Sequence, residues 1–263
     1  MFDAHCHLDD PRIQPDIHER LAIARQQGLT GFLCAGVCLE RWQQQQEIAQ
    51  KHTDVFLAYG LHPWWVETLT EAELQKTLHA LEHWLTQTTP RPIALGELGL
   101  DRSRRIPEKA LPALERAFRE QLALARDLNL PVVLHAVKAH GRLLEILRRD
   151  GLPEAGGMIH GFSGSSGLAE EYQRQGLYLS IGGAVTRLSA KKLRKAVVAI
   201  DSSRILVETD SPDQLPLGFE ETHNSPASLP LVLAALAECR GETISSVVAQ
   251  TTSNVYTLFA LTR

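Results

Sequence analysis

Histidines near the N-terminus are spaced as the ligands of a metal ion would be. His5 and His7 are separated by one residue in the segment Asp3-Ala4-His5-Cys6-His7. Alternate residues of a β-strand point to the same face, so both imidazoles would face one side and Cys6 the other. Two adjacent imidazoles repel each other when protonated, and a divalent cation would keep both neutral. A hydrogen-bonded structural pair is the alternative that this spacing leaves open.

Four further candidate ligands lie beside short apolar segments later in the chain. They are Glu97 in GELGLD, His135 in PVVLH, His160 in GGMIH and Asp210 in VETDSP. A carboxylate has two oxygens, so Glu97 could bridge two cations. We assign Asp210 to metal binding and, with Glu97, to catalysis, where it would orient a water nucleophile and take its proton. Nitrogen and oxygen ligands without thiolates favour Zn²⁺ or Mn²⁺, with Mg²⁺ or Co²⁺ as alternatives.

Other polar residues are predicted to support this chemistry. Asp3 and Glu208 each precede a candidate ligand by two residues, so they would share its face and support it by hydrogen bonding from deeper in the fold. For Asp3 the alternative is a buried capping carboxylate. Asp101, four residues after Glu97, is expected to form a supporting ion pair rather than to bind metal.

Two residues are candidates for substrate binding. Ser163 precedes a predicted helix whose first amides could hold an anion. Capping of that helix by Ser165 or Ser166 explains the same serines equally well. Arg187 could contact a phosphate, or it could be a solvated surface residue.

The segments that must position these side chains alternate between strand and helix patterns. One helix is indicated by Leu111, Leu114, Phe118 and Leu122, and the last two by residues 229–239 and 244–259. The eight predicted strands are Met1–His5, Thr30–Gly36, Asp54–Gly60, Arg91–Gly96, Leu130–His135, Gly156–His160, Leu177–Ile181 and Arg204–Thr209.

Eight strand–helix units of about 33 residues each predict an α/β protein, a (β/α)8 TIM-type barrel in one domain over residues 1–263. Barrels carry their catalytic groups at the C-terminal ends of the strands, where most of the candidate ligands fall. An open doubly wound sheet would require a glycine-rich loop after the first strand, and HCHLDD stands there instead. The polar, proline-rich segment Ser211–Pro226 is expected to be an active-site loop.

Composition restricts the class of protein. The 263 residues are 44% hydrophobic and 22% charged with a net charge of −4, so a polyanionic substrate would need local positive charge or metal. The four cysteines form no CxxC pair and are expected to be reduced thiols of a cytoplasmic protein. We see no signal-peptide pattern and no membrane-spanning segment, and we expect neither membrane attachment nor an obligate protein partner.

These motifs, in this order, resemble the TatD family of metal-dependent hydrolases among the amidohydrolase-like barrels. The resemblance covers nearly the whole chain and includes FDAHCHLD, GLHP, GELGLD, PVVLH, HGFSG and VETDSP. It implies phosphodiesterase activity, usually described as deoxyribonuclease, and two divalent metal ions per chain, with Glu97 bridging and His62 contacting the substrate. The metal ligands it implies are His5, His7, Glu97, His135, His160 and Asp210.

The chain departs from the family pattern at two places. Val137 stands where the family usually has arginine, with Lys138 after it, and HGFSG stands for the usual HCFSG. The missing arginine removes a bidentate phosphate contact and weakens the case for DNA as the substrate, but it leaves the metal chemistry intact. Trp64 and Trp65, which follow His62, could stack on a base or pack against a helix.

Three functional hypotheses follow. The first is hydrolysis of a phosphodiester in nucleic acid or of a small, nucleotide-like phosphate ester. The second is hydrolysis of an amide, lactone or ester by the same hydroxide, since one fold supports both chemistries. The third is a catalytically silent metal-binding protein, which is disfavoured because all six candidate ligands are present.

Overall fold

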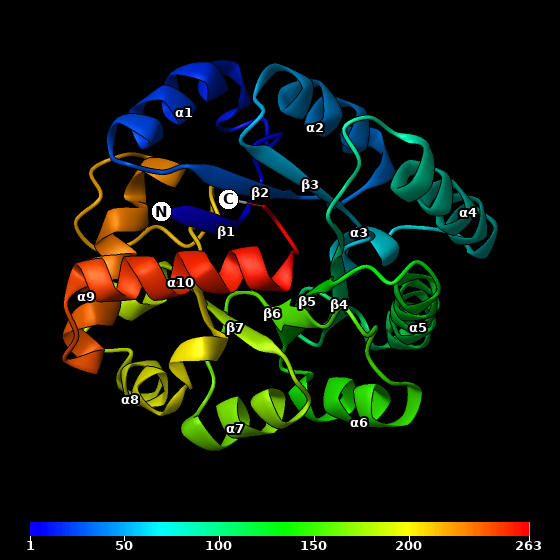
Figure 1. The fold of residues 1–263 in the computed structure, drawn as a ribbon. Coiled ribbons are helices and arrows are strands. Elements are labelled where there is room, and N and C mark those ends of the chain that lie inside the picture. The colour runs from blue at the N-terminus through cyan, green and yellow to red at the C-terminus, as the bar shows by residue number, and fades with distance from the viewer. Residues whose placement is uncertain (263) are drawn as a thin grey trace. The chain divides into compact units, whose positions relative to one another are not determined.

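The computed structural model describes residues 1–262, and its strands follow one another in an eight-stranded parallel sheet in the order β1 to β8. This order, with helices between the strands, is the predicted (β/α)8 arrangement (Figure 1). The strands are β1 (Phe2–Cys6), β2 (Gly31–Ala35), β3 (Val55–Tyr59), β4 (Ala94–Asp101), β5 (Val132–Val137), β6 (Gly157–Ile159), β7 (Tyr178–Ile181) and β8 (Ile205–Val207). The helices are α1 (Ile17–Gln26), α2 (Leu39–Lys51), α3 (Pro63–Val66), α4 (Glu71–Gln87), α5 (Leu111–Asp127), α6 (His140–Asp150), α7 (Ser166–Arg174), α8 (Lys191–Ala199), α9 (Leu229–Arg240) and α10 (Ile244–Leu258).

The chain divides into two compact units. The first unit is Met1–Cys34 with His160–Arg263, and the second unit is Ala35–Ile159. The predicted single domain over residues 1–263 stays a prediction.

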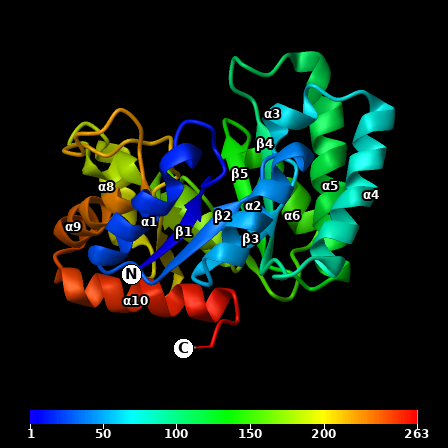
Figure 2. The ribbon, with the colours of Figure 1, turned by 90° about the horizontal axis from the view of Figure 1, so that it is seen from above.

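In the first unit the first and last strands lie side by side. Beyond β8, the Asp210 N–H donates to the His5 carbonyl at 2.9 Å, and the His7 N–H donates to the Ser211 carbonyl at 2.8 Å. Helix α10 packs against both β1 and β8, and Figure 2 shows it running across β1 near the N-terminus. The residues that follow β1 and β8 are therefore held together by backbone hydrogen bonds.

In the second unit, helix α5 packs against β4 and against α4 (Figure 1). Its buried face includes Leu114, Phe118 and Leu122, three members of the predicted apolar stripe. Helix α4 begins with a capping box, in which Thr70 accepts from the Glu73 N–H and the Glu73 carboxylate accepts from the Thr70 N–H. The capping box thus explains where α4 begins, and the apolar stripe explains which side of α5 is buried.

The predicted bounds of β4 were wrong. The sequence pattern ended this strand at Gly96, whereas β4 continues to Asp101 and carries Glu97 within it. The glycines serve close strand pairing instead of ending the strand: a Cβ on Gly99 would lie 2.0 Å from the His135 carbonyl oxygen, and one on Gly96 would lie 2.6 Å from the Val133 Cβ. His135 likewise lies within β5 and not at its end.

Two other predictions from the sequence concern cysteines and membranes. The four cysteines are thiols that form no disulfide among residues 1–262. Among residues 1–262, no helix combines the length and apolar character needed to cross a bilayer.

Gln121 connects α5 to the segment that carries His62. Its buried side chain accepts from the Leu61 N–H at 2.7 Å and donates to the Leu61 carbonyl at 3.3 Å. A buried backbone group that loses its partner costs about 1–3 kcal/mol. The Gln121 side chain therefore contributes to both stability and the placement of the next residue.

We predict that Gln121→Leu lowers the free energy of unfolding by about 1–3 kcal/mol, because it leaves both polar groups of Leu61 without a partner. Urea unfolding followed by circular dichroism measures the change. Gln43→Leu, on the exposed side of α2, is the matched control and should stay within about 0.5 kcal/mol. Equal effects of the two substitutions would contradict this role of Gln121.

Candidate metal centre

Three ligand atoms of the first unit converge beside the ends of β1 and β8. Nε2 of His5 lies 3.3 Å from Nε2 of His7, and these two nitrogens lie 3.3 and 3.4 Å from Oδ1 of Asp210. In a tetrahedral zinc site with bonds of about 2.0–2.1 Å, neighbouring ligand atoms are about 3.3 Å apart. The spacing of these three atoms therefore fits one divalent cation held by two imidazoles and a carboxylate.

Asp210 reaches this position through an unusual backbone conformation. Its φ is +54°, in the left-handed region that residues with side chains adopt at some energetic cost, often at functional sites. Gln214 Nε2 donates to Oδ2 of Asp210 at 2.7 Å, which leaves Oδ1 to face the two histidines. The predicted β8 extended to Thr209, but the strand ends at Val207, so Asp210 lies in the loop that follows.

The electrostatics of Asp210 favour its anionic form. Burial alone would raise the pKa of this carboxyl, but its side-chain contacts with His5 and His7 and the proximity of His160 hold the pKa well below its ordinary value. An ionised carboxylate is the form that binds a cation.

A second group of the first unit contains His5, His160 and Glu208, whose ligand atoms lie within 4.8 Å of one another. The rings of His5 and His160 stack with centroids 4.0 Å apart. Oε1 of Glu208 accepts from the Gly161 N–H and lies 3.7 Å from Nδ1 of His160. The other oxygen, Oε2, is buried without a hydrogen-bond partner among the described residues. A cation would compensate this buried charge, so the group also fits metal binding.

Asp3 is a buried residue of β1 whose carboxylate is hydrogen-bonded to Thr209 in the loop that follows β8. Its carboxylate accepts from Thr209 Oγ1 at 2.6 Å, from the Thr209 N–H at 2.9 Å and from the His5 backbone N–H at 3.4 Å. Burial raises the pKa of Asp3 to about 7, although the Thr209 hydrogen bonds oppose the rise. The partners of Asp3 are thus backbone and hydroxyl groups, and its predicted role in orienting an imidazole stays a prediction.

The second unit brings together Glu97, His135 and His62. Oε1 of Glu97 lies 2.8 Å from Nδ1 of His135 and 3.2 Å from Nε2 of His62, and the two ring nitrogens are 3.3 Å apart. All three side chains are buried. One carboxylate oxygen therefore faces two imidazole nitrogens, and the chemistry depends on which of these nitrogens carries a proton.

The backbone decides the protonation of His62. Its Nδ1 accepts from the Trp64 N–H at 3.0 Å at the beginning of α3, so the proton of the neutral ring is on Nε2. A nitrogen that carries a proton cannot bind a metal ion. The geometry therefore makes His62 a hydrogen-bond donor and leaves Glu97 and His135 as the ligands of this group.

Asp101 contacts both His135 and Trp64. Its Oδ2 accepts from Trp64 Nε1 at 2.6 Å and lies 3.3 Å from Nε2 of His135, while Oδ1 accepts from the Ser103 N–H at 2.6 Å. Burial would raise the pKa of Asp101, but the hydrogen bonds from His135, Ser103 and Trp64 hold it below its ordinary value. The predicted role of Asp101 as a supporting ion pair stays a prediction, and these contacts are compatible with it.

The residues proposed to bind substrate lie in different settings. Ser163 is exposed, and Ser165 caps α7 by accepting from the Leu168 N–H at 3.3 Å, which agrees with the capping alternative. Arg187 is also exposed and donates to the Leu215 carbonyl at 2.9 Å. Lys138, which follows the departure at Val137, is exposed with a φ of +52°.

Sequence reasoning missed two residues that hold the β8 loop. Gln214 donates to Asp210, and Asn224 Nδ2 donates to the carbonyls of Thr209 and Asp213, both at 2.8 Å. Both lie in the predicted loop Ser211–Pro226. The search for functional residues at the C-terminal ends of predicted strands does not reach this loop. Polar amides inside a proline-rich loop beside a candidate ligand are the only hint that the sequence offered.

We predict that Thr209→Val lowers the free energy of unfolding by about 1–3 kcal/mol, because it removes a hydrogen bond to the buried carboxylate of Asp3. Thr252→Val is the matched control, since the buried Thr252 hydroxyl has no partner among the described residues and its loss should be neutral or stabilising. Urea unfolding measures both changes. A destabilisation by Thr252→Val as large as that by Thr209→Val would rule out this account.

Comparison with known proteins adds independent information. Residues 2–260 match the family model described as TatD related DNase. The 3'-5' ssDNA/RNA exonuclease TatD of Klebsiella pneumoniae is 35% identical over 272 residues, covering 99% of this chain and 98% of that protein. YjjV of Escherichia coli, an uncharacterized metal-dependent hydrolase, is 32% identical over 258 residues, covering 98% and 97%. The crystal structure of YjjV matches all of this chain with a TM-score of 0.92, at 31% identity and 98% coverage of YjjV.

Proposed function

This chain belongs to the TatD-related DNase family and is a metal-dependent hydrolase of nuclease type, and we propose that it cleaves phosphodiester bonds in single-stranded nucleic acid. The observation that carries the proposal is the convergence of Nε2 of His5, Nε2 of His7 and Oδ1 of Asp210 at the spacing of a metal's ligands. A relative named as an exonuclease for single-stranded DNA and RNA supports this class of substrate.

We propose that each chain binds two divalent cations. In the first unit His5, His7, His160 and Asp210 are the proposed ligands. In the second unit they are Glu97 and His135, and Glu97 stays the proposed bridging ligand. The imidazole-rich donor set favours Zn²⁺ or Mn²⁺, with Mg²⁺ or Co²⁺ as alternatives.

The side chains have separate tasks in this proposal. Bound divalent cations would neutralise phosphate charge and lower the pKa of water. Asp210, held as an anion, accepts a hydrogen bond from the attacking water and orients it. His62 donates a hydrogen bond from its Nε2–H group to a phosphate oxygen. Asp101 fixes the ring of His135 from its other nitrogen.

A carbonyl substrate is the second candidate, and one observation favours it. Val137 stands at the end of β5 where the family usually has arginine, so this position supplies no guanidinium to a phosphate. An amide, lactone or ester would not need that contact. A lactone and an amide therefore serve as the competing substrates in the activity test.

We propose a cytoplasmic location because four cysteines without a disulfide among the described residues suit a reducing compartment. The proposed partners are limited to the substrate, either nucleic acid or a small phosphate ester. No membrane and no obligate protein partner enter the proposal.

We predict that protein loaded with Zn²⁺ or Mn²⁺ cleaves a single-stranded oligonucleotide, that EDTA abolishes cleavage and that added metal restores it. Asp210→Asn should reduce kcat at least about 10³-fold, because an amide orients water poorly. Cleavage is measured by gel electrophoresis and metal content by mass spectrometry, with a lactone and an amide as competing substrates. Turnover of the lactone or amide without cleavage of the oligonucleotide would overturn the proposal.

We predict that His62→Gln lowers kcat/KM by about 10²-fold and leaves the metal content unchanged, because His62 presents a proton rather than a lone pair. His135→Gln is the comparison and should reduce the bound metal. Equilibrium dialysis followed by mass spectrometry measures the metal. A loss of metal from His62→Gln equal to that from His135→Gln would show that His62 is a ligand.

A further inference from the structure

The loop after β4 carries three exposed cations, Arg102, Arg104 and Arg105, which we call the β4-loop cations. Among residues 1–262, none of these three guanidinium groups has a carboxylate partner. Three arginines of the neighbouring helices differ, since they are ion-paired: Arg116 with Glu71, Arg119 with Asp150 and Arg142 with Glu115. The loop therefore carries three guanidinium charges that no carboxylate of the described residues compensates.

Trp64 lies beside the β4-loop cations as a fixed aromatic surface. The guanidinium of Arg105 lies over the ring of Trp64, 4.1 Å from the ring centroid. Trp64 itself is 37% exposed. The hydrogen bond from Nε1 to Asp101 holds the indole in place, and its ring also contacts His62 with centroids 4.9 Å apart. Unpaired bases stack on aromatic rings and on arginine guanidinium groups, and this site offers both.

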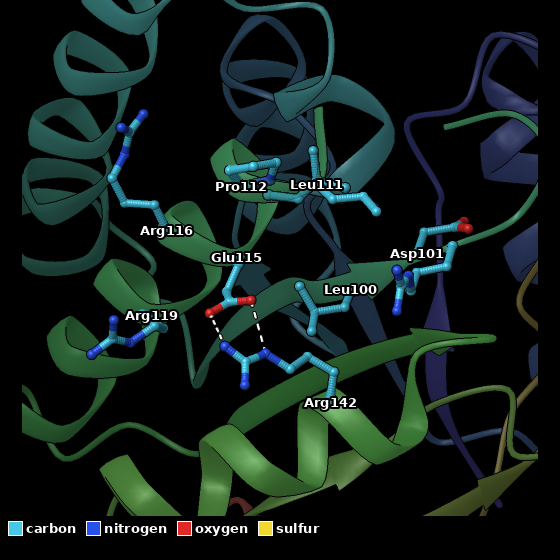
Figure 3. Close-up of a pocket in the computed structure, with 10 residues that line it drawn as sticks. Leu100, Asp101, Leu111, Pro112, Glu115, Arg116, Arg119 and Arg142 are labelled. Atoms are coloured by element: carbon cyan, nitrogen blue, oxygen red, sulfur yellow. Dashed lines mark hydrogen bonds and ion pairs between the residues drawn. The ribbon is translucent and has the colours of Figure 1, made fainter. Parts of the chain in front are cut away.

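A pocket of about 440 Å³ adjoins the same loop. Leu100, Leu111 and Pro112 supply an apolar surface, and Figure 3 shows Arg142 and Glu115 facing each other inside it. Asp101 and Arg102 also line the pocket. Because Asp101 contacts Trp64 and His135 as well, the pocket, the indole and a candidate metal ligand are all connected through one carboxylate.

We propose that Trp64 and the β4-loop cations, with the adjoining pocket, bind the unpaired strand of the substrate beyond the nucleotide that is cleaved. The guanidinium groups contact its phosphates and the indole stacks on a base. The substrate class rests on the proposed function. Because the chain has a net charge of −4, local positive charge of this kind is needed to attract a polyanion. Paired bases cannot stack on the indole, so this surface selects single strands over duplexes.

The test compares two triple variants that remove equal charge. One is Arg102→Gln, Arg104→Gln and Arg105→Gln, and the control is Lys51→Gln, Lys76→Gln and Arg91→Gln, three exposed cations of the second unit. Fluorescence anisotropy measures binding of a labelled 12-nucleotide single strand and of its duplex, with EDTA present so that cleavage does not interfere.

The wild type should bind the single strand more tightly than the duplex. The β4-loop variant should raise the single-strand Kd at least about 10-fold and reduce the slope of log K against log salt by about 2, since each phosphate contact on a single strand contributes about 0.7. The control should change Kd less than about twofold. Equal Kd values for the two triple variants, or no binding by the wild type, would overturn the proposal.

Trp64→Phe tests the stacking separately. Tryptophan fluorescence of the wild type should be quenched on addition of the unlabelled strand, and the variant, which keeps the other three tryptophans, should lose most of this quenching. Undiminished quenching would refute stacking on Trp64. If the strand binds as expected but metal-loaded wild type cleaves no nucleic acid, the proposed function fails while this binding surface stands.

Discussion

Mutual repulsion of protonated imidazoles is the constraint on which the first unit depends. His5 contacts His7 edge to face and His160 face to face, so the three rings cannot all carry protons at little cost. Asp210 and Glu208 bring negative charge to the same place, and one oxygen of Glu208 is buried without a hydrogen-bond partner in the part of the chain that the structure describes. A divalent cation resolves both problems, because it binds neutral imidazoles and compensates carboxylates.

In the second unit, the direction of hydrogen bonds separates residues that look alike in sequence. His62 and His135 both face Glu97, but the Trp64 N–H occupies Nδ1 of His62 and thereby assigns its proton to Nε2. Asp101 faces the opposite nitrogen of His135. Backbone and supporting carboxylates therefore decide which imidazole donates a proton and which one offers a lone pair.

Substrate recognition has to work against the overall charge. A chain with a net charge of −4 attracts nucleic acid only where positive charge is concentrated, either as metal or as unpaired arginine. The departure at Val137 removes one such arginine from the end of β5, while the loop after β4 supplies three others. Loops at the strand ends of a rigid scaffold are where such binding groups can differ between relatives.

The sequence by itself determined the strand–helix alternation, the candidate ligands and the family resemblance. Residue spacing indicates which side chains share a face of a strand or helix, and motif order is read directly from the chain. It misplaced the end of β4, since Gly96 and Gly99 look like strand breakers until β5 is seen to leave no room for side chains there. Only the tertiary structure decided the proton of His62, the anchoring of Asp210 by Gln214 and the stacking of Arg105 on Trp64. The first two are contacts between residues two and four positions apart, and they depend on turn conformations that no sequence pattern specifies. The third joins residues that are distant in the chain.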